Sequence, residues 1–264
     1  MTTWDPANYA ANSNPQFSWG RALLTKCNLK GFEHIIDIGC GDGKLTAELA
    51  RNVSRGKVLG IDSSTEFINH ATQKYSAAFS NLSFQIMDAT KIYLPPSTNK
   101  FDIVFSNAAL HWFNDHQSFF KGAAGVLKGG GKLITSCGGG KNGHQIIKAF
   151  DNAAGMTKWK DCFESFEFPY AFYKPDDCMP WLENAGFRVE SVELVDKEMR
   201  FENVEGFKGY LKSAWLPWIS RVEESRNEEF VQDVVDVFVK DCADDSRERF
   251  CVGMQRLEGG AFKM

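Results

Sequence analysis

Three alternating glycines in the segment Asp37-Ile38-Gly39-Cys40-Gly41-Asp42-Gly43 have the spacing of a loop that approaches a ligand through its backbone. Glycine permits tight turns and places no Cβ in the path of a bound molecule. Neither common phosphate-binding pattern fits this loop. A dinucleotide fingerprint requires glycine where Lys44 stands, and a P-loop requires Ser or Thr where Leu45 stands. The loop therefore predicts a ligand that is not held through phosphate groups.

Two further carboxylates follow apolar runs downstream of the loop. Asp62 ends the run 57–61, and its carboxylate can accept hydrogen bonds from both hydroxyls of a ribose. Asp88, followed by Ala89, comes after the run 82–86 and can accept from an adenine amino group. Acidic side chains without a phosphate-binding lysine suit a ligand that carries adenosine but no phosphate. We predict S-adenosyl-L-methionine, with S-adenosyl-L-homocysteine as product, and with the methionine end at the glycine loop.

The elements that must position these residues alternate along the first half of the chain. Short apolar runs predict strands at 34–38, 57–61, 82–86, 101–105 and 132–136. Between them, apolar residues at helical spacing predict helices at 45–53 and around 117–127, and the capping box 63–66 opens a further helix with Phe67, Ile68, Ala71 and Tyr75 on one face. This alternation predicts an α/β fold, a parallel sheet with helices on both faces and a ligand outside the carboxyl ends of the strands.

The second half has a different pattern. Residues 144–186 read as helices and loops, 187–195 as a strand, 203–242 as helices, and 249–257 as a final strand. We therefore expect a single domain, 1–264, in which helices are inserted as a cap before the last strand. Its parts are a helical lid at 1–30, a cofactor-binding core at 31–136, helices and a strand at 137–202, a helical cap at 203–242 and the last strand at 243–264.

Composition excludes several classes of protein. The 264 residues contain 30 Lys and Arg against 34 Asp and Glu, so no basic excess favours nucleic acid. No apolar run approaches the roughly 18 residues of a membrane span, and the N-terminus does not resemble a signal peptide. The seven cysteines are widely spaced, which argues against a disulfide framework or a metal cluster. We expect a cytoplasmic monomer that binds a small-molecule substrate and no metal, nucleic acid or membrane.

Taken together, these motifs resemble the class I S-adenosylmethionine-dependent methyltransferases. The matching segments are 35–43, 60–64, 88–89 and 101–108. The resemblance implies a Rossmann-like, doubly wound, seven-stranded sheet whose last strand is antiparallel, and it places Asn107 beside the methionyl part of the cofactor. The residues that it assigns to the cofactor are Tyr9, Asp37, Gly39, Gly41, Gly43, Asp62, Ser63, Asp88, Ala89 and Asn107.

A narrower resemblance, to the trans-aconitate methyltransferases and the insect juvenile hormone acid methyltransferases, involves the segments 4–9, 108–112 and 216–218. Both groups methylate carboxylates. Gln16 and Trp112 match the positions associated with the substrate carboxylate in the juvenile hormone group, and Trp19 and Trp218 can close over an apolar substrate. One departure is the pair Gly259-Gly260, where the family usually has a continuous apolar strand.

Methyl transfer from a sulfonium mainly requires that the nucleophile be aligned. A carboxylate is ionised near neutral pH and needs no base, whereas an amine or phenol needs one, and His111 is the candidate catalytic residue for that role. We predict a methyltransferase that forms a methyl ester on a small organic acid. C- or N-methylation of another small metabolite, or a catalytically silent binding module, remain alternatives, while Lys44 disfavours an NAD oxidoreductase.

Overall fold

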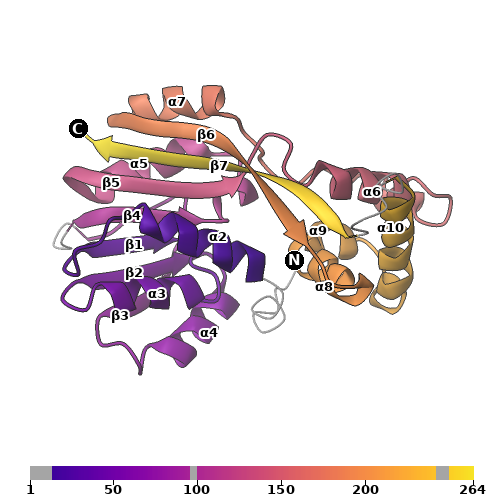
Figure 1. Cartoon of the computed structure of the whole chain (residues 1–264), viewed down its shortest axis with the longest axis horizontal. Coiled ribbons are helices and arrows are strands. Elements are labelled where there is room, and N and C mark those ends of the chain that lie inside the picture. The colour runs from indigo at the N-terminus through magenta and orange to yellow at the C-terminus, as the bar shows by residue number, and fades with distance from the viewer. Residues whose placement is uncertain (1–13, 96–99, 242–249) are drawn as a thin grey trace. The chain divides into compact units, whose positions relative to one another are not determined.

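The short apolar runs of the first half become neighbouring strands of a seven-stranded sheet in the computed structural model, which describes residues 14–95, 100–241 and 250–264. The strand order is β3-β2-β1-β4-β5-β7-β6, and β7 is antiparallel to β5 (Figure 1). The strands are β1 (His34–Ile38), β2 (Lys57–Asp62), β3 (Leu82–Ile86), β4 (Phe101–Asn107), β5 (Leu127–Gly138), β6 (Phe187–Arg200) and β7 (Cys251–Lys263). The order reverses between β1 and β4, and in such sheets ligands bind beyond the carboxyl ends of the strands at this reversal.

Helices cover both faces of the sheet, as the α/β pattern predicts. On one face, α2 (Asn14–Thr25) and α3 (Lys44–Asn52) contribute Leu23 and Leu49 to a buried core. On the other face, α5 (His116–Val126) and α7 (Pro175–Asn184) contribute Phe119 and Leu182 to a second core. The helix α4 (Thr65–Tyr75) connects β2 to β3 and begins at Ser64, whose hydroxyl accepts from the Phe67 N–H. The predicted doubly wound fold is confirmed.

Two strands, β5 and β7, are longer than the sequence predicts. In both, glycines that interrupt the apolar pattern lie inside the strand. The strand β5 begins at Leu127 rather than Lys132 and includes three consecutive glycines. The strand β7 continues through Gly259 and Gly260 to Lys263, so the expected end near residue 257 is wrong. A Cβ at Gly259 would lie 2.9 Å from Thr135 Oγ1, and one at Gly260 would lie 3.2 Å from Glu190 Oε2. These glycines therefore make room for side chains of neighbouring strands.

The chain forms two compact units, and two of the boundaries between them fall within β6 and β7. The sheet unit comprises Asn14–Gly140, Tyr170–Val195 and Arg256–Met264. The helical unit includes Lys141–Pro169 and Asp196–Gln255, so it takes in the predicted cap together with a segment before β6. Its helices are α6 (His144–Ala154), α8 (Val204–Ala214), α9 (Leu216–Ile219) and α10 (Asn227–Asp241). Across the three described ranges, every helix is too short or too polar to cross a membrane.

Candidate active site

The glycine loop joins β1 to α3 at the carboxyl end of β1. Gly39 has a φ of 75°, and a Cβ there would lie only 2.2 Å from Ala109 Cβ, so the close approach of the two segments requires glycine. Gly41 has a φ of 53°, yet a Cβ built on it would meet nothing within 4 Å. Gly43 is the N-cap residue of α3. The open space beside Gly41 leaves the backbone of the loop accessible to a ligand.

Asp62, at the end of β2, ties the loop to the next strand. Its two carboxylate oxygens accept from the Gly41 N–H and the Ser64 N–H, both at 3.0 Å. Burial raises the pKa of the Asp62 carboxyl, and backbone hydrogen bonds from Ser64, Gly41 and Ser63 oppose that rise. An ionised carboxylate has about four lone-pair positions, so these two bonds leave capacity for ribose hydroxyls.

Asp88 and Ala89 follow β3, as expected, but the Asp88 side chain is exposed and bonds within its own loop. Its Oδ1 accepts from the Thr90 N–H and the Thr90 hydroxyl, both at 2.8 Å, and Lys91 Nζ lies 3.9 Å from its Oδ2. The Thr90 backbone hydrogen bond is the main cause that lowers the pKa of Asp88. Ala89 is half-buried and packs against the core. The structure thus brings an ionised carboxylate to the β3 end of the sheet.

Two more acids belong to the loop. Asp37 is buried and accepts from the Thr46 hydroxyl at 2.7 Å, and burial raises the pKa of its carboxyl to about 7. Asp42, which the sequence analysis did not assign, is also buried, and its Oδ1 accepts from the Lys44 N–H at 3.1 Å. Its Oδ2 is buried and accepts no hydrogen bond from the described residues. A buried, unsatisfied carboxylate oxygen is costly unless a ligand donor reaches it.

Asn107, at the end of β4, is the point where the N-terminal helix meets the sheet. Its Nδ2 donates to the Gln16 backbone oxygen at 3.3 Å, and a Cβ at Gly20 would lie 2.9 Å from that Nδ2. The Gln16 side-chain oxygen is buried and has no hydrogen-bond partner in the described part of the chain. Because the amide can rotate to present its NH2 instead, this position can donate to an anionic oxygen.

His111 and Trp112 follow Asn107 in a short 3-10 turn, Leu110–Trp112. The His111 Nδ1 accepts from the Gly138 N–H at 3.2 Å, so in the neutral ring the proton is on Nε2. Burial is the main cause that lowers the pKa of His111 well below its usual range. Trp112 is 36% exposed and packs edge-on against Tyr170, with ring centroids 4.8 Å apart. The Nδ1 lone pair of His111 is therefore already engaged by a backbone donor.

Comparison with known proteins identifies the family to which this chain belongs. A family described as "Methyltransferase domain" matches residues 36–135, the segment from β1 into β5. The uncharacterized methyltransferase C70.08c of Schizosaccharomyces pombe is 31% identical over 235 residues, which cover 84% of this chain and 86% of that protein. The chain belongs to the class I S-adenosylmethionine-dependent methyltransferases.

Methyltransferases whose names state an acceptor are also similar to this chain. Juvenile hormone acid O-methyltransferase of Drosophila melanogaster is 23% identical, with 79% of this chain and 72% of that one aligned. Trans-aconitate 2-methyltransferase of Deinococcus radiodurans is 30% identical, over 50% of this chain and 48% of that one. Among solved structures, Haemonchus contortus phosphoethanolamine N-methyltransferase 2 with S-adenosylhomocysteine has a TM-score of 0.59 and 18% identity. That match covers 93% of this chain and 52% of the other, and it shows that the fold is shared.

The loop residues of this methyltransferase fit its cofactor. The open cradle at Gly41 admits the methionyl part, and the unsatisfied Asp42 Oδ2 can accept from its ammonium group. Asp62 has acceptor capacity for the ribose. S-adenosylmethionine, when bound, supplies a methyl group already activated on a sulfonium. The protein's part is then to hold the acceptor in line and to exclude water.

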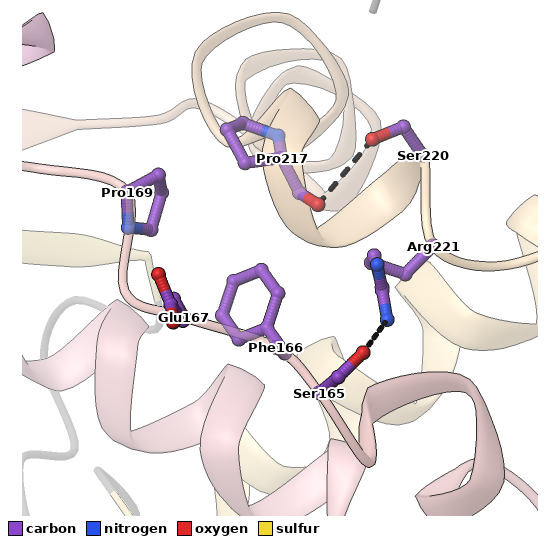
Figure 2. Close-up of a pocket in the computed structure, with 7 residues that line it drawn as sticks. All are labelled: Ser165, Phe166, Glu167, Pro169, Pro217, Ser220 and Arg221. Atoms are coloured by element: carbon purple, nitrogen blue, oxygen red, sulfur yellow. Dashed lines mark hydrogen bonds between the residues drawn. The ribbon is translucent and has the colours of Figure 1, made fainter. Parts of the chain in front are cut away.

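The predicted substrate residues divide between the two units. Gln16, Trp19 and Trp112 belong to the sheet unit, and Trp218 belongs to the helical unit. Trp218 is fully buried, and its ring centroid lies 4.8 Å from that of Phe166. Phe166 in turn lines a cavity of about 390 Å³ within the helical unit (Figure 2). Tyr9, predicted at the cofactor, lies outside the described residues. No group of three metal-ligating side chains occurs within the described ranges.

Arg256 was not predicted from the sequence. This arginine on β7 is 3% exposed and lies opposite Gly138 of β5 in the strand register. Its Nη2 donates to the Ser136 backbone oxygen at 2.8 Å and to Asn107 Oδ1 at 3.5 Å. No local pattern indicates this residue, because its partners are more than a hundred positions away in the chain.

Proposed function

We propose that this enzyme transfers the methyl group to the carboxylate of a small organic acid and forms a methyl ester. The observation that carries the proposal is the hydrogen bond from the Gly138 N–H to His111 Nδ1. This bond occupies the nitrogen that would accept a proton in the neutral ring. His111, in the turn after β4, is therefore unsuited to deprotonate an amine or a phenol.

A carboxylate acceptor needs no such base. It is ionised near neutral pH, since carboxyl groups have pKa values of about 4. An oxygen of the carboxylate forms a bond to the methyl carbon as the carbon–sulfur bond breaks. The negative carboxylate and the positive sulfonium become a neutral ester and a neutral thioether, and no proton is released.

Donors that suit a carboxylate lie at this end of the sheet. The Gln16 side-chain oxygen is buried and lacks a partner in the described chain, and rotation of the amide would place its NH2 donor there. Trp112 carries an indole N–H on a partly exposed ring. We assign these two side chains to the acceptor carboxylate, and we assign the ring of Trp19 to the pocket wall. The names of the trans-aconitate and juvenile hormone acid enzymes support an acid as acceptor.

The test is incubation with S-adenosylmethionine labelled in its methyl group and a panel of carboxylic acids, amines and phenols. We expect label in products that release methanol on mild alkaline hydrolysis, because methyl esters are cleaved under those conditions. Label found only in alkali-stable amine, ether or carbon-methylated products would overturn the proposal.

A further inference from the structure

The helical unit contains a cavity of about 390 Å³, which is large enough to take a small molecule (Figure 2). Its walls come from two segments that are far apart in the chain, 165–169 and 217–221. The second segment includes part of α9 and the turn that follows it. Both segments belong to the helical unit, so this unit forms the cavity alone.

Part of the cavity wall is apolar and rigid. Phe166, Pro169 and Pro217 line it. The half-buried Phe166 ring packs on the fully buried ring of Trp218, with the ring centroids 4.8 Å apart. Aromatic and proline side chains that are already fixed by packing lose little freedom when a ligand binds. The wall therefore suits a ligand with an apolar body.

Arg221 brings a positive charge to the same cavity. Its Nε donates to the Cys162 backbone oxygen at 3.0 Å, and its Nη2 donates to the Ser165 hydroxyl at 3.3 Å (Figure 2). Both acceptors are neutral, so these bonds orient the guanidinium without cancelling its charge. Within the described residues Arg221 forms no ion pair, and its Nη1 donates no hydrogen bond. That nitrogen can donate to an anionic group of a ligand.

Glu167 brings a negative charge to the cavity. Its side chain is exposed, and in the part of the chain that the structure describes it takes part in no hydrogen bond or ion pair. In the view of Figure 2 the ring of Phe166 lies between Glu167 and Arg221. Two opposite charges thus line one cavity without pairing to each other. A ligand that carries both charges can satisfy both side chains.

We propose that this cavity binds a small zwitterion with an apolar body, such as a free apolar amino acid. Arg221 donates to the carboxylate of the ligand, Glu167 accepts from its ammonium group, and the apolar part lies on the Phe166 ring. Binding makes and breaks no covalent bond. The inference goes beyond the proposed function and does not rest on it, because methyl transfer to an acid assigns no role to the residues of this cavity.

The experiment measures binding by calorimetry to the protein saturated with S-adenosylhomocysteine, which keeps amino acids out of the cofactor site. One set of probes is phenylalanine, phenethylamine, which lacks the carboxylate, and hydrocinnamate, which lacks the ammonium group. The other set is ε-aminocaproate, hexylamine and hexanoate, in which the two charges are further apart. The parent should bind the better zwitterion at least about threefold more tightly than either single-charge analogue, since contacts of exposed charges are individually modest.

Two variants assign the charges to their side chains. Arg221→Gln should weaken binding of the zwitterion and of the carboxylate by about threefold and leave the amine unchanged. Glu167→Gln should weaken binding of the zwitterion and of the amine by the same factor and leave the carboxylate unchanged. Binding of the unaffected analogue shows that each variant is folded. Arg55→Gln and Glu202→Gln, which remove exposed charges elsewhere, are the matched controls and should change nothing.

Three results would overturn the inference. The first is equal affinity of the zwitterion and its single-charge analogues. The second is a zwitterion preference that survives in Arg221→Gln or in Glu167→Gln, because the ligand would then bind elsewhere on the protein. The third is absence of binding of both zwitterions at concentrations up to about 10 mM.

Discussion

The cofactor half and the acceptor half of the site are assembled in different ways. The cofactor half consists of the loop 37–43 and the ends of β2 and β3, and its tie from Gly41 to Asp62 spans 21 positions in the chain. The proposed acceptor half consists of Gln16 and the His111–Trp112 turn, which adjoin Asn107, the predicted cofactor residue at the end of β4. Asn107 lies 91 positions from Gln16, to which it donates, and 149 positions from Arg256, from which it accepts. The cofactor half is formed by residues that are close in the chain, whereas the acceptor half forms only when elements far apart in the chain come together.

The two halves differ in what they bind. The cofactor has a fixed chemistry, and the backbone geometry of one local loop is enough to hold it. The proposed acceptor half is built from α2 and the turn after β4, which lie outside the sequence of the loop. We expect substitutions in the cofactor half to weaken binding of S-adenosylhomocysteine strongly, and those in the acceptor half to leave it nearly unchanged.

The largest effect is expected from Gly41→Val, which should weaken S-adenosylhomocysteine binding by more than about a hundredfold. A branched side chain would fill the open space beside the loop backbone at Gly41. Gly130→Val is the matched control, since Gly130 also has positive φ and open space but lies near the start of β5. Both variants should lose roughly 1–2 kcal/mol of stability from left-handed strain. Calorimetry measures the loss of affinity, and thermal unfolding measures the loss of stability. Equal affinities of the two variants for S-adenosylhomocysteine would contradict the division into a cofactor half and an acceptor half.

Asp62→Ala should lower S-adenosylhomocysteine affinity by roughly 2–4 kcal/mol, because two charge-assisted hydrogen bonds to the ribose are lost. The variant also releases the Gly41 N–H from its present acceptor. Asp102→Ala is the control: its carboxylate likewise accepts a backbone N–H, from His34 at 2.8 Å, but at the start of β4. Unchanged affinity in the Asp62 variant, measured by calorimetry, would remove Asp62 from the cofactor half.

The same division explains what could be predicted from the sequence. The strands, the sheet's ligand edge and the loop follow from apolar runs and glycine spacing, which are local signals. The extension of β7 through Gly259 and Gly260 could not be predicted, because glycine there depends on Thr135 and Glu190 of other strands. Arg256 was missed for the same reason. Nothing near it in sequence distinguishes it from a surface arginine, and only the pairing of β7 with β5 buries it beside Asn107.

Gln16→Ala and Trp112→Phe test the acceptor half with smaller expected effects. Each removes one hydrogen-bond donor and should raise KM for the acid by roughly five- to a hundredfold, which corresponds to about 1–3 kcal/mol. Binding of S-adenosylhomocysteine should stay within about twofold of the parent. Trp181→Phe is the control for a lost indole N–H, since Trp181 packs against Tyr173 on the α7 face. A parallel loss of cofactor affinity would show that the two halves are not independent.

The smallest effect on turnover is expected from His111, provided that the protein remains folded. His111→Ala leaves the Gly138 N–H without its acceptor, which costs about 1–3 kcal/mol of stability. His111→Gln can keep that hydrogen bond through its amide oxygen and is the better test of catalysis. Because the acceptor is already ionised, turnover of His111→Gln at neutral pH should stay within about tenfold of the parent.

The pH dependence gives the same test a second readout. His111 has a lowered pKa in the folded protein, whereas an unfolded histidine ionises below about pH 6.5. The parent therefore loses stability as pH falls below that value, and His111→Gln should lack this part of the loss. Above about pH 6.5 His111 is neutral in the folded protein. The turnover rate of the parent should therefore show no histidine titration between about pH 6.5 and 9. A rate that rises with pH through such a titration, with a more than thousandfold loss in His111→Gln, would instead identify a base acting on an amine or hydroxyl. The acceptor half would then recognise a neutral nucleophile, and the carboxylate proposal would fail.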